Sequence, residues 1–414
     1  MKETARIGII GLGCRGIFWV EQLLKIPHAE LVAVCDVYDD RIVRAQEQAE
    51  KLCGQKPQGF ADYQEMLDSV ELDGVLIITN WELHFEIAIE AMKRGIRPGI
   101  EAGGANSIED CFELVRVSEE TGIPCMFMEN CCYGREEMAV LNMVKKGLFG
   151  ELLHCEAGYA HDLRDEICLG GENRHYRLPH YLTRNGDNYP THGIGPMANC
   201  LNINRGNRFT RLVSMATKEY GLSAWVKENL APDHALQGKT FAQGDVVTTM
   251  LQCENGQTVL LTLSTSLPRA YSRYNVVQGA NGMWMEDGRH IHIEGRSQPH
   301  LWEDFDPYME EYDHPLWKEY QAMEVENLGH GGMDYLIGAA FVESVREGTE
   351  PPLDVYDAAV FSVITVLSEQ SIAQGSAPVE FPDFTHGLWK NRTPSNSGKY
   401  ALDRIPEEYF FEKN

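Results

Sequence analysis

The residues Arg6–Gly16, RIGIIGLGCRG, decide how the first part of the chain folds. An apolar run leads directly into three glycines, and an amphipathic segment follows from Ile17. This order predicts a strand, a tight turn and a helix. In such a turn Gly11 permits the sharp bend, Gly13 lets a pyrophosphate approach the backbone, and Gly16 lets the helix pack closely on the strand. The stretch therefore predicts a dinucleotide-binding turn.

A second apolar run, LVAVCDV (31–37), supports this interpretation. It carries Asp36, which lies 20 residues beyond Gly16. A carboxylate at this place can hold the adenosine ribose hydroxyls and repel a 2′-phosphate, so we predict NAD as the cofactor. Arg15 and Arg41 are the nearby cations that would suit NADP instead. The alternative is an ordinary α/β turn that binds no nucleotide.

Composition excludes several function classes. A chain of 414 residues exceeds one ordinary core, which predicts two domains. The balance of 36 basic and 62 acidic residues argues against nucleic acid or an anionic membrane as partner. Eleven cysteines without a CxxC pair are typical of a reducing compartment. No signal peptide precedes the first strand and no apolar run is long enough to span a membrane, so we expect a cytoplasmic protein.

Strand and helix patterns alternate as far as residue 128 and then change character. We predict an α/β protein in which residues 1–128 form a Rossmann domain with a doubly wound parallel sheet. Residues 129–414 are expected to form an α+β domain with a largely antiparallel open sheet. Within it we expect loops over 165–191 and an acidic surface insertion over 303–327. Asp39 or Asp40 is expected to cap the second helix.

Polar residues follow the predicted strands of the first domain. Asn80–His84 follows one strand, Glu101 and Ala102 end the next, and Asn130 ends the last. Ligands bind at the carboxyl ends of parallel strands, so these residues are candidates for the nucleotide site. For Asn80–His84 the alternative is a helix start with a packed tryptophan.

The second domain carries a different set of candidates, rich in tyrosine and histidine. Tyr159 and His161 alternate onto one face of a predicted strand. Tyr189 and His192 flank Pro190 and Thr191 in RNGDNYPTHGIGP (184–196). Histidine is the commonest general acid or base because its pKa lies near neutrality. The alternatives are a core histidine at 161 and a helix-start histidine at 192.

Three further candidates lie near these stretches or later in the chain. Arg177 precedes this stretch, and Tyr271 lies in PRAYSR (268–273) after an apolar strand. His330–Asp334 is a weaker candidate, and its alternative is a glycine-rich helix start. Histidine and carboxylate spacings match no zinc motif, so we predict no metal.

Several of these strings together resemble known families. The first part resembles the Gfo/Idh/MocA oxidoreductases. Over roughly residues 1–400 the chain resembles the NAD-dependent α-N-acetylgalactosaminidases of glycoside hydrolase family 109. The strings that carry this resemblance are ENCCYGREEMAVLNMVKKGLFGEL, YAHDLR, RNGDNYPTHGIGP, INRGNRF, PRAYSR and GHGGMD.

The resemblance implies a retaining glycosidase in which tightly bound NAD is reduced and reoxidised within one turnover. The sugar is oxidised at C3, loses its C2 proton and C1 substituent, adds water and is reduced again. The expected partner is a small glycoside, such as an α-N-acetylgalactosaminide, and the expected assembly is a homo-oligomer. The catalytic residues implied are His192, Tyr189, Tyr159 and His161. The sugar-binding residues implied are Tyr159, Arg177, Tyr189, His192 and Tyr271. The NAD-binding residues implied are Gly11, Gly13, Cys14, Arg15, Gly16, Asp36, Asn80, Trp81, Leu83, His84, Glu101, Ala102 and Asn130.

Two other functions compete with this interpretation. One is a net NAD-dependent sugar dehydrogenase, and the other is a non-catalytic nucleotide sensor. In sugar-oxidising relatives of this architecture the stretch at Glu101 reads Glu-Lys-Pro, and the lysine serves the hydroxyl that is oxidised. Ala102 stands in place of that lysine, which argues against the dehydrogenase. The density of tyrosine, histidine and arginine argues against the sensor.

Overall fold

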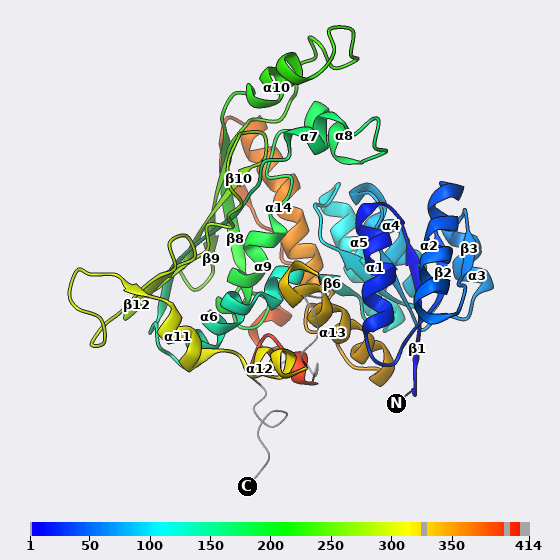
Figure 1. The fold of residues 1–414 in the computed structure, drawn as a ribbon. Helices are drawn as coiled ribbons and strands as arrows, with labels where there is room; N and C mark the ends of the chain where they lie inside the picture. The colour runs from blue at the N-terminus through cyan, green and yellow to red at the C-terminus, as the bar shows by residue number, and fades with distance from the viewer. Residues whose placement is uncertain (1, 324–328, 393–397, 406–414) are drawn as a thin grey trace. The chain divides into compact units, whose positions relative to one another are not determined.

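The computed structural model describes residues 2–323, 329–392 and 398–405. They form two compact units, drawn in Figure 1. Unit 1 takes its described residues from Met1–Met138, Asp313–Val360 and Thr393–Asn414, and unit 2 from Ala139–Tyr312 and Phe361–Arg392. The chain therefore returns to unit 1 after building most of unit 2.

Unit 1 contains a six-stranded parallel sheet in the order β3-β2-β1-β4-β5-β6. Ile9 of the central strand pairs with Val34 on one side and Leu76 on the other, and all three are buried. Continuous apolar strands are what a sheet covered on both faces requires. The predicted doubly wound parallel sheet is confirmed. Its strands are β1 (Ala5–Ile10), β2 (Ala29–Cys35), β3 (Gln58–Phe60), β4 (Gly74–Ile77), β5 (Arg97–Glu101) and β6 (Met126–Met128).

Helices alternate with these strands, and further helices come from later in the chain. The α-helices of the first stretch are α1 (Cys14–Lys25), α2 (Asp39–Cys53), α3 (Tyr63–Ser69), α4 (His84–Lys93), α5 (Ile108–Thr121) and α6 (Arg135–Lys145), which continues into unit 2. Short 3₁₀ turns are η1 (Trp81–Leu83) and η2 (Asn130–Tyr133). The returning chain adds α12 (Pro315–Ala322), η3 (His330–Gly332), α13 (Met333–Glu347), the first turns of α14 (Val355–Ala373) and η5 (Gly398–Tyr400).

Two local predictions in unit 1 need correction. α1 begins at Cys14, directly after the turn, and not at Ile17. The cap expected at Asp39 or Asp40 is wrong, because Tyr38 occupies that position without a side-chain hydrogen bond. The two aspartates lie in the first turn of α2, where carboxylates interact favourably with the helix dipole.

The returning helix α13 packs against α1, β1 and β6. Gly338 makes this close approach possible, because a Cβ there would lie 2.6 Å from Ile26 Cδ1 and 2.9 Å from Trp19 Cζ3. Asp334, in the first turn of α13, is consequently carried to the carboxyl edge of the parallel sheet. Residues far apart in the sequence thus share one edge of unit 1.

Unit 2 contains a nine-stranded sheet in the order β14-β13-β12-β11-β7-β10-β9-β8-β15. All neighbours pair antiparallel except β7 and β10, so the predicted largely antiparallel sheet is confirmed. Its longer strands are β7 (Leu152–Ala160), β8 (Phe209–Ala216), β9 (Val247–Cys253) and β10 (Thr258–Ser264). The shorter strands are β11 (Val276–Gly279), β12 (Gly282–Met285), β13 (His290–Ile293), β14 (Glu303–Asp304) and β15 (Val379–Glu380).

One helix of unit 2 lies unusually close to this sheet. α9 packs on β7, and a Cβ on Gly193 would lie 2.6 Å from the backbone nitrogen of Gly158. Two glycines at the crossing bring the N-terminal turn of α9 next to the end of β7. The other helices of the unit are α7 (Arg164–Cys168), α8 (Arg177–Thr183), α9 (Thr191–Cys200), α10 (Gly221–Asn229), α11 (Asp306–Tyr312), the later turns of α14 and η4 (Leu388–Lys390).

Two stretches, one expected to be loop-rich and one expected to be a surface insertion, contain helices and buried side chains. Residues 165–191 contain most of α7 and all of α8, and Asp187 and Tyr189 are buried. Residues 303–323 form α11 and α12 and bury Tyr308 and Trp317, so the expected surface insertion is wrong there. Residues 324–327 of that stretch lie outside the described part of the chain. Each helix carries acidic residues on one side and aromatic residues on the other, and the acidic residues led to the prediction of a surface segment. No helix within the described residues is long and apolar enough to cross a bilayer.

Candidate functional site

The glycine-rich turn of unit 1 has the shape that a pyrophosphate requires. Gly11 has φ +92°, and a Cβ there would lie 2.4 Å from the carbonyl oxygen of Ile78. A Cβ on Gly16 would lie 1.9 Å from the carbonyl oxygen of Gly11, so only glycine fits. At Gly13 the nearest atom would be Arg41 Nη1, 3.7 Å away. The backbone is therefore crowded at Gly11 and Gly16 and open at Gly13, where α1 begins and its first amide groups can face an anion.

Asp36 lies beside this turn at the end of β2. Its carboxylate accepts the backbone N–H of Leu12 at 2.7 Å and that of Tyr38 at 3.0 Å. Arg41 Nη1 lies 3.5 Å from the same group. Two backbone amides thus fix a carboxylate that keeps further acceptor capacity. This arrangement suits a ligand with a pair of hydroxyl groups.

Other predicted cofactor residues follow β4, β5 and β6 at the same edge of the sheet. Trp81 is buried in η1, and Cα of Gly103 lies close enough that a Cβ there would be 2.3 Å from the Trp81 ring. His84 is buried, and its Nε2 lies 3.1 Å from the Thr79 carbonyl oxygen. Burial lowers the pKa of His84 to about 4, so this ring is neutral at pH 7. The remaining predicted residues of this edge are Cys14, which is exposed, Asn80 and Leu83, which are half-buried, and Ala102, which is buried.

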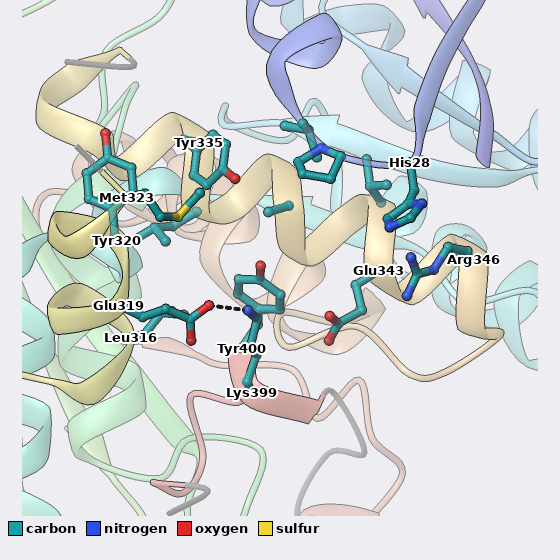
Figure 2. Close-up of a pocket in the computed structure, with 15 residues that line it drawn as sticks. His28, Leu316, Glu319, Tyr320, Met323, Tyr335, Glu343, Arg346, Lys399 and Tyr400 are labelled. Carbon is teal, nitrogen blue, oxygen red and sulfur yellow. Dashed lines mark hydrogen bonds and ion pairs between the residues drawn. The ribbon is translucent and has the colours of Figure 1, made fainter. Parts of the chain in front are cut away.

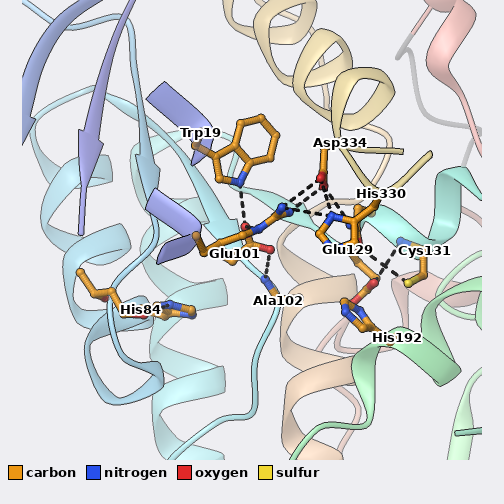
Figure 3. A network of polar contacts seen from close by, with 12 residues as sticks. Trp19, His84, Glu101, Ala102, Glu129, Cys131, His192, His330 and Asp334 are labelled. Carbon is orange, nitrogen blue, oxygen red and sulfur yellow. Dashed lines mark hydrogen bonds and ion pairs between the residues drawn. The ribbon is translucent and has the colours of Figure 1, made fainter. Parts of the chain in front are cut away.

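Charged side chains from three segments meet around Arg15. Its Nε donates to Glu101 Oε2 at 2.8 Å, and its two terminal nitrogens donate to the two oxygens of Asp334 at 2.9 and 2.7 Å. Trp19 Nε1 also donates to Glu101 Oε2, at 2.9 Å. Asn130 Nδ2 donates to Asp334 Oδ1 at 2.9 Å. Figure 3 labels Trp19, Glu101 and Asp334 and marks their polar contacts with dashed lines.

The charge state of Asp334 follows from these partners. Its side chain is fully buried, and burial alone would raise the pKa of the carboxyl group. Hydrogen bonds and charge from Arg15, and from His330 whose Nδ1 lies 2.6 Å away, outweigh burial and lower that pKa well below its usual range. Asp334 is therefore ionised at every physiological pH.

In unit 2 the tyrosines and histidines predicted from sequence form one aromatic cluster, namely Tyr159, His161, Tyr189, His192 and Tyr271. Tyr159 occupies its centre, with ring centroids 4.8 Å from Tyr189, 5.4 Å from His192 and 6.1 Å from Tyr271. Tyr189 Oη lies 3.3 Å from His192 Nε2, and Tyr159 Oη lies 3.0 Å from His161 Nδ1. Each histidine thus has a phenol within hydrogen-bonding reach.

Arg177 places a positive charge beside the cluster. Its guanidinium is buried, lies 5.1 Å from the Tyr189 ring centroid and donates through Nε to Glu166 at 2.7 Å. Burial raises the pKa of Tyr159, although the charge of Arg177 opposes this. Burial lowers the pKa of His161. At neutral pH the cluster therefore holds a protonated phenol and a neutral imidazole, which suits proton transfer.

The structure thus groups the predicted residues by unit. All predicted cofactor residues lie in unit 1 at the carboxyl edge of the sheet, and all predicted sugar residues lie in unit 2. Sequence reasoning missed Trp19, and it included Asp334 only within a weaker candidate, His330–Asp334, without a role at the cofactor. The string GHGGMD carried the signal for Asp334, but the separation of 319 positions from Arg15 concealed the pairing.

A separate cavity of about 300 Å³ in unit 1 contains none of the predicted residues. It is lined by Tyr335, Tyr400 and the Glu319–Lys399 ion pair, among others (Figure 2). It also touches Ile26–His28, at the opposite end of α1 from the glycine turn. Since a 12-residue helix is about 18 Å long, the cavity is remote from the predicted cofactor residues.

Comparisons with known proteins match a family to each of the two parts of the chain. The C-terminal domain of glycosyl hydrolase 109 matches residues 133–391, and the NAD-binding Rossmann fold of the oxidoreductase family matches residues 5–129. An α-N-acetylgalactosaminidase from Tannerella forsythia is 43% identical, covering 94% of this chain and 88% of that protein. A glycosyl hydrolase family 109 protein from Stenotrophomonas maltophilia is also 43% identical, covering 96% and 93%.

Solved structures agree on the fold. A scyllo-inositol dehydrogenase from Lactobacillus casei, solved with NAD(H) and scyllo-inositol, superposes with a TM-score of 0.66 at 13% identity, covering 91% of this chain and 99% of that one. An oxidoreductase from Agrobacterium radiobacter, in complex with NAD⁺, gives a TM-score of 0.65 at 16% identity, covering 91% and 98%. With an N-terminal domain of the NAD-binding Rossmann type and a matching C-terminal domain over most of its length, this chain is a glycoside hydrolase and belongs to glycosyl hydrolase family 109.

Proposed function

We propose that this enzyme hydrolyses α-N-acetylgalactosaminides with retention, through a redox-neutral sequence of oxidation, elimination, water addition and reduction. The observation that carries the proposal is the aromatic cluster, which holds two phenol–imidazole pairs and a buried arginine. Proton transfer at a sugar is what such groups do well. The Tannerella forsythia relative is an α-N-acetylgalactosaminidase, which supports this choice of sugar.

The residues of unit 1 fit NAD. Gly13 leaves space at the backbone for a pyrophosphate, α1 begins there, and Asp36 is held by two backbone amides for the ribose hydroxyls. When bound, NAD supplies a hydride acceptor for sugar C3 and returns the hydride in the same turnover. Arg15 is committed to Glu101 and Asp334, which removes it as a partner for a 2′-phosphate and favours NAD over NADP.

The residues of unit 2 would hold the sugar and move its protons. His192 and Tyr189 act as the main acid–base pair, at the oxidised hydroxyl and at C2. Tyr159 and His161 form the second pair, and Arg177 and Tyr271 bind sugar hydroxyls. Arg177 also keeps positive charge near Tyr189, which stabilises the phenolate form during transfer.

One experiment tests this function. The purified protein is incubated with aryl α-N-acetylgalactosaminide in D₂O without added NAD. We expect sugar release with deuterium at C2 and no net NADH. Stoichiometric NADH would instead establish a net dehydrogenase, and the absence of cleavage on a broad glycoside panel would support a nucleotide sensor.

Assembly, location and domain boundary are further proposals. We propose a homo-oligomer formed through the outer face of the unit 2 sheet, where Met215 and Met250 are 64% and 42% exposed on neighbouring strands. Light scattering on the protein would test this. A cytoplasmic location is supported by the eleven cysteines, all of which lie within the described residues and outside any disulfide bond. The matched family segments support a domain boundary near residue 129.

A further inference from the structure

Asp334 links two residues that the proposed function places at the cofactor. Both of its oxygens accept from Arg15, in the first turn of α1, and Oδ1 also accepts from Asn130, just after β6. These segments follow strands three places apart in the sheet, with β1 in its middle and β6 at its edge. One carboxylate therefore sets the spacing of two parts of the cofactor edge.

The contacts of Arg15 fix the orientation of its guanidinium group. A bidentate arginine–carboxylate pair fixes the plane of the guanidinium as well as its position. Nε of the same group is fixed by Glu101, at the end of β5. Only 26% of the Arg15 side chain is exposed, and it lies 5.3 Å from the ring centroids of both Phe18 and Trp19. The guanidinium is thus held from three sides.

We propose that Asp334 is a positioning residue for NAD, which acts through Arg15 and Asn130 without touching the cofactor. The inference rests on the proposed function, because it assumes that Arg15 and Asn130 line NAD. It implies that the cofactor edge of unit 1 is completed only by the returning helix α13. The Rossmann sequence 1–128 contains the motif but lacks the carboxylate that orders it.

The test compares Asp334→Asn with a matched control in the full-length protein. Asp357→Asn removes another buried aspartate from the first turn of the next helix of the same unit. NADH affinity is measured by titrating nicotinamide fluorescence, and glycoside cleavage is measured separately. We expect the NADH Kd to rise about tenfold to a hundredfold in Asp334→Asn, with the glycoside KM changed less than twofold, because charge-assisted hydrogen bonds are lost. The Asp357→Asn Kd should match the wild type.

A double-mutant cycle distinguishes positioning from a general loss of stability. Arg15→Gln alone should weaken NADH binding, and adding Asp334→Asn to it should change the Kd by less than about threefold. Should Asp334→Asn not fold, Asp334→Glu and Arg15→Gln supply the same comparison. An unchanged Kd in Asp334→Asn, or additive effects in the double variant, would overturn the inference. A wild type that binds NADH but cleaves no glycoside overturns only the proposed function, whereas one that binds no NADH overturns both.

Discussion

The cofactor edge of unit 1 and the aromatic cluster of unit 2 are built in opposite ways. The first is held by ion pairs, with Arg15 fixed between two carboxylates at 2.7–2.9 Å. The second is held by tilted and edge-on ring contacts at 4.7–6.1 Å, and burial favours the neutral forms of Tyr159 and His161. A resident cofactor needs a permanent, rigid site, whereas proton transfer needs groups that can change charge. The difference suggests that variants in each region should affect separate steps.

The largest expected effect comes from removing the central histidine of the aromatic cluster. His192→Ala should lower kcat by about 10² to 10⁴, the range for a lost general acid or base. NADH affinity should not change, because the cofactor edge keeps all its contacts. Turnover of an aryl glycoside and NADH titration measure the two quantities. His292→Ala, on β13, serves as the control, and full activity in His192→Ala would remove this residue from the mechanism.

At the glycine turn we expect the opposite of the His192→Ala result, namely a change in NADH affinity. A Cβ on Gly13 meets nothing closer than 3.7 Å, so Gly13→Ala should fold with an unchanged Tm. The methyl group would occupy the space offered to a pyrophosphate, and we expect the NADH Kd to rise about tenfold to a hundredfold. Gly171→Ala, which also meets open space, is the control for both measurements. Normal NADH affinity in Gly13→Ala would contradict the placement of the phosphates.

A pH effect on stability is expected from Asp187, two residues before Tyr189. Burial raises the pKa of this carboxyl group from its ordinary 3.8 to about 7. Between these values the folded state keeps a proton that the unfolded state has lost, so the free energy of unfolding should fall as pH rises from about 4 to 7. The expected slope in that window is about 1.4 kcal/mol per pH unit, and it should vanish in Asp187→Asn. Urea unfolding at several pH values measures the free energy of unfolding. The same pH dependence in the wild type and in Asp187→Asn would refute the prediction.

The smallest effect is expected at the rim of the aromatic cluster. Tyr271 is 49% exposed, so Tyr271→Phe keeps the ring contacts and removes only a hydroxyl. Loss of one hydrogen bond to the sugar, about 0.5–1.5 kcal/mol, should raise KM about twofold to tenfold with little change in kcat. Tyr220→Phe, 65% exposed elsewhere in unit 2, should leave both constants unaltered.

Local patterns were sufficient for the parallel sheet and the aromatic cluster. Gly11 has a positive φ, Gly16 leaves no space for a Cβ, and Gly13 is open, which is the pattern predicted for the turn. The alternation of Tyr159 and His161 follows from the strand period. The RNGDNYPTHGIGP stretch predicted that Tyr189 and His192 flank Pro190 and Thr191, and in the structure Tyr189 Oη lies 3.3 Å from His192 Nε2.

Long-range contacts could not be predicted from local sequence patterns. Asp334 is one acidic residue among 62, and nothing local distinguishes its pairing with Arg15. The helices of 303–323 were missed because net charge dominated the composition, although Tyr308, Trp317 and Tyr320 form a buried pattern. In 165–191, burial of polar residues such as Asp187 depends on helices that follow later in the chain, including α14 through Ser368 Oγ.

The ion pair between Arg15 and Asp334 also has a consequence for the order of events during protein synthesis. The two residues are separated by 319 positions, with most of unit 2 translated between them. At about 5–20 residues per second, a nascent chain presents Arg15 roughly 16–64 s before its carboxylate partner leaves the ribosome. During that interval the glycine turn is complete in sequence but lacks its anchor. Cofactor capture is therefore expected after translation has passed α13, as one of the last steps in the maturation of this enzyme.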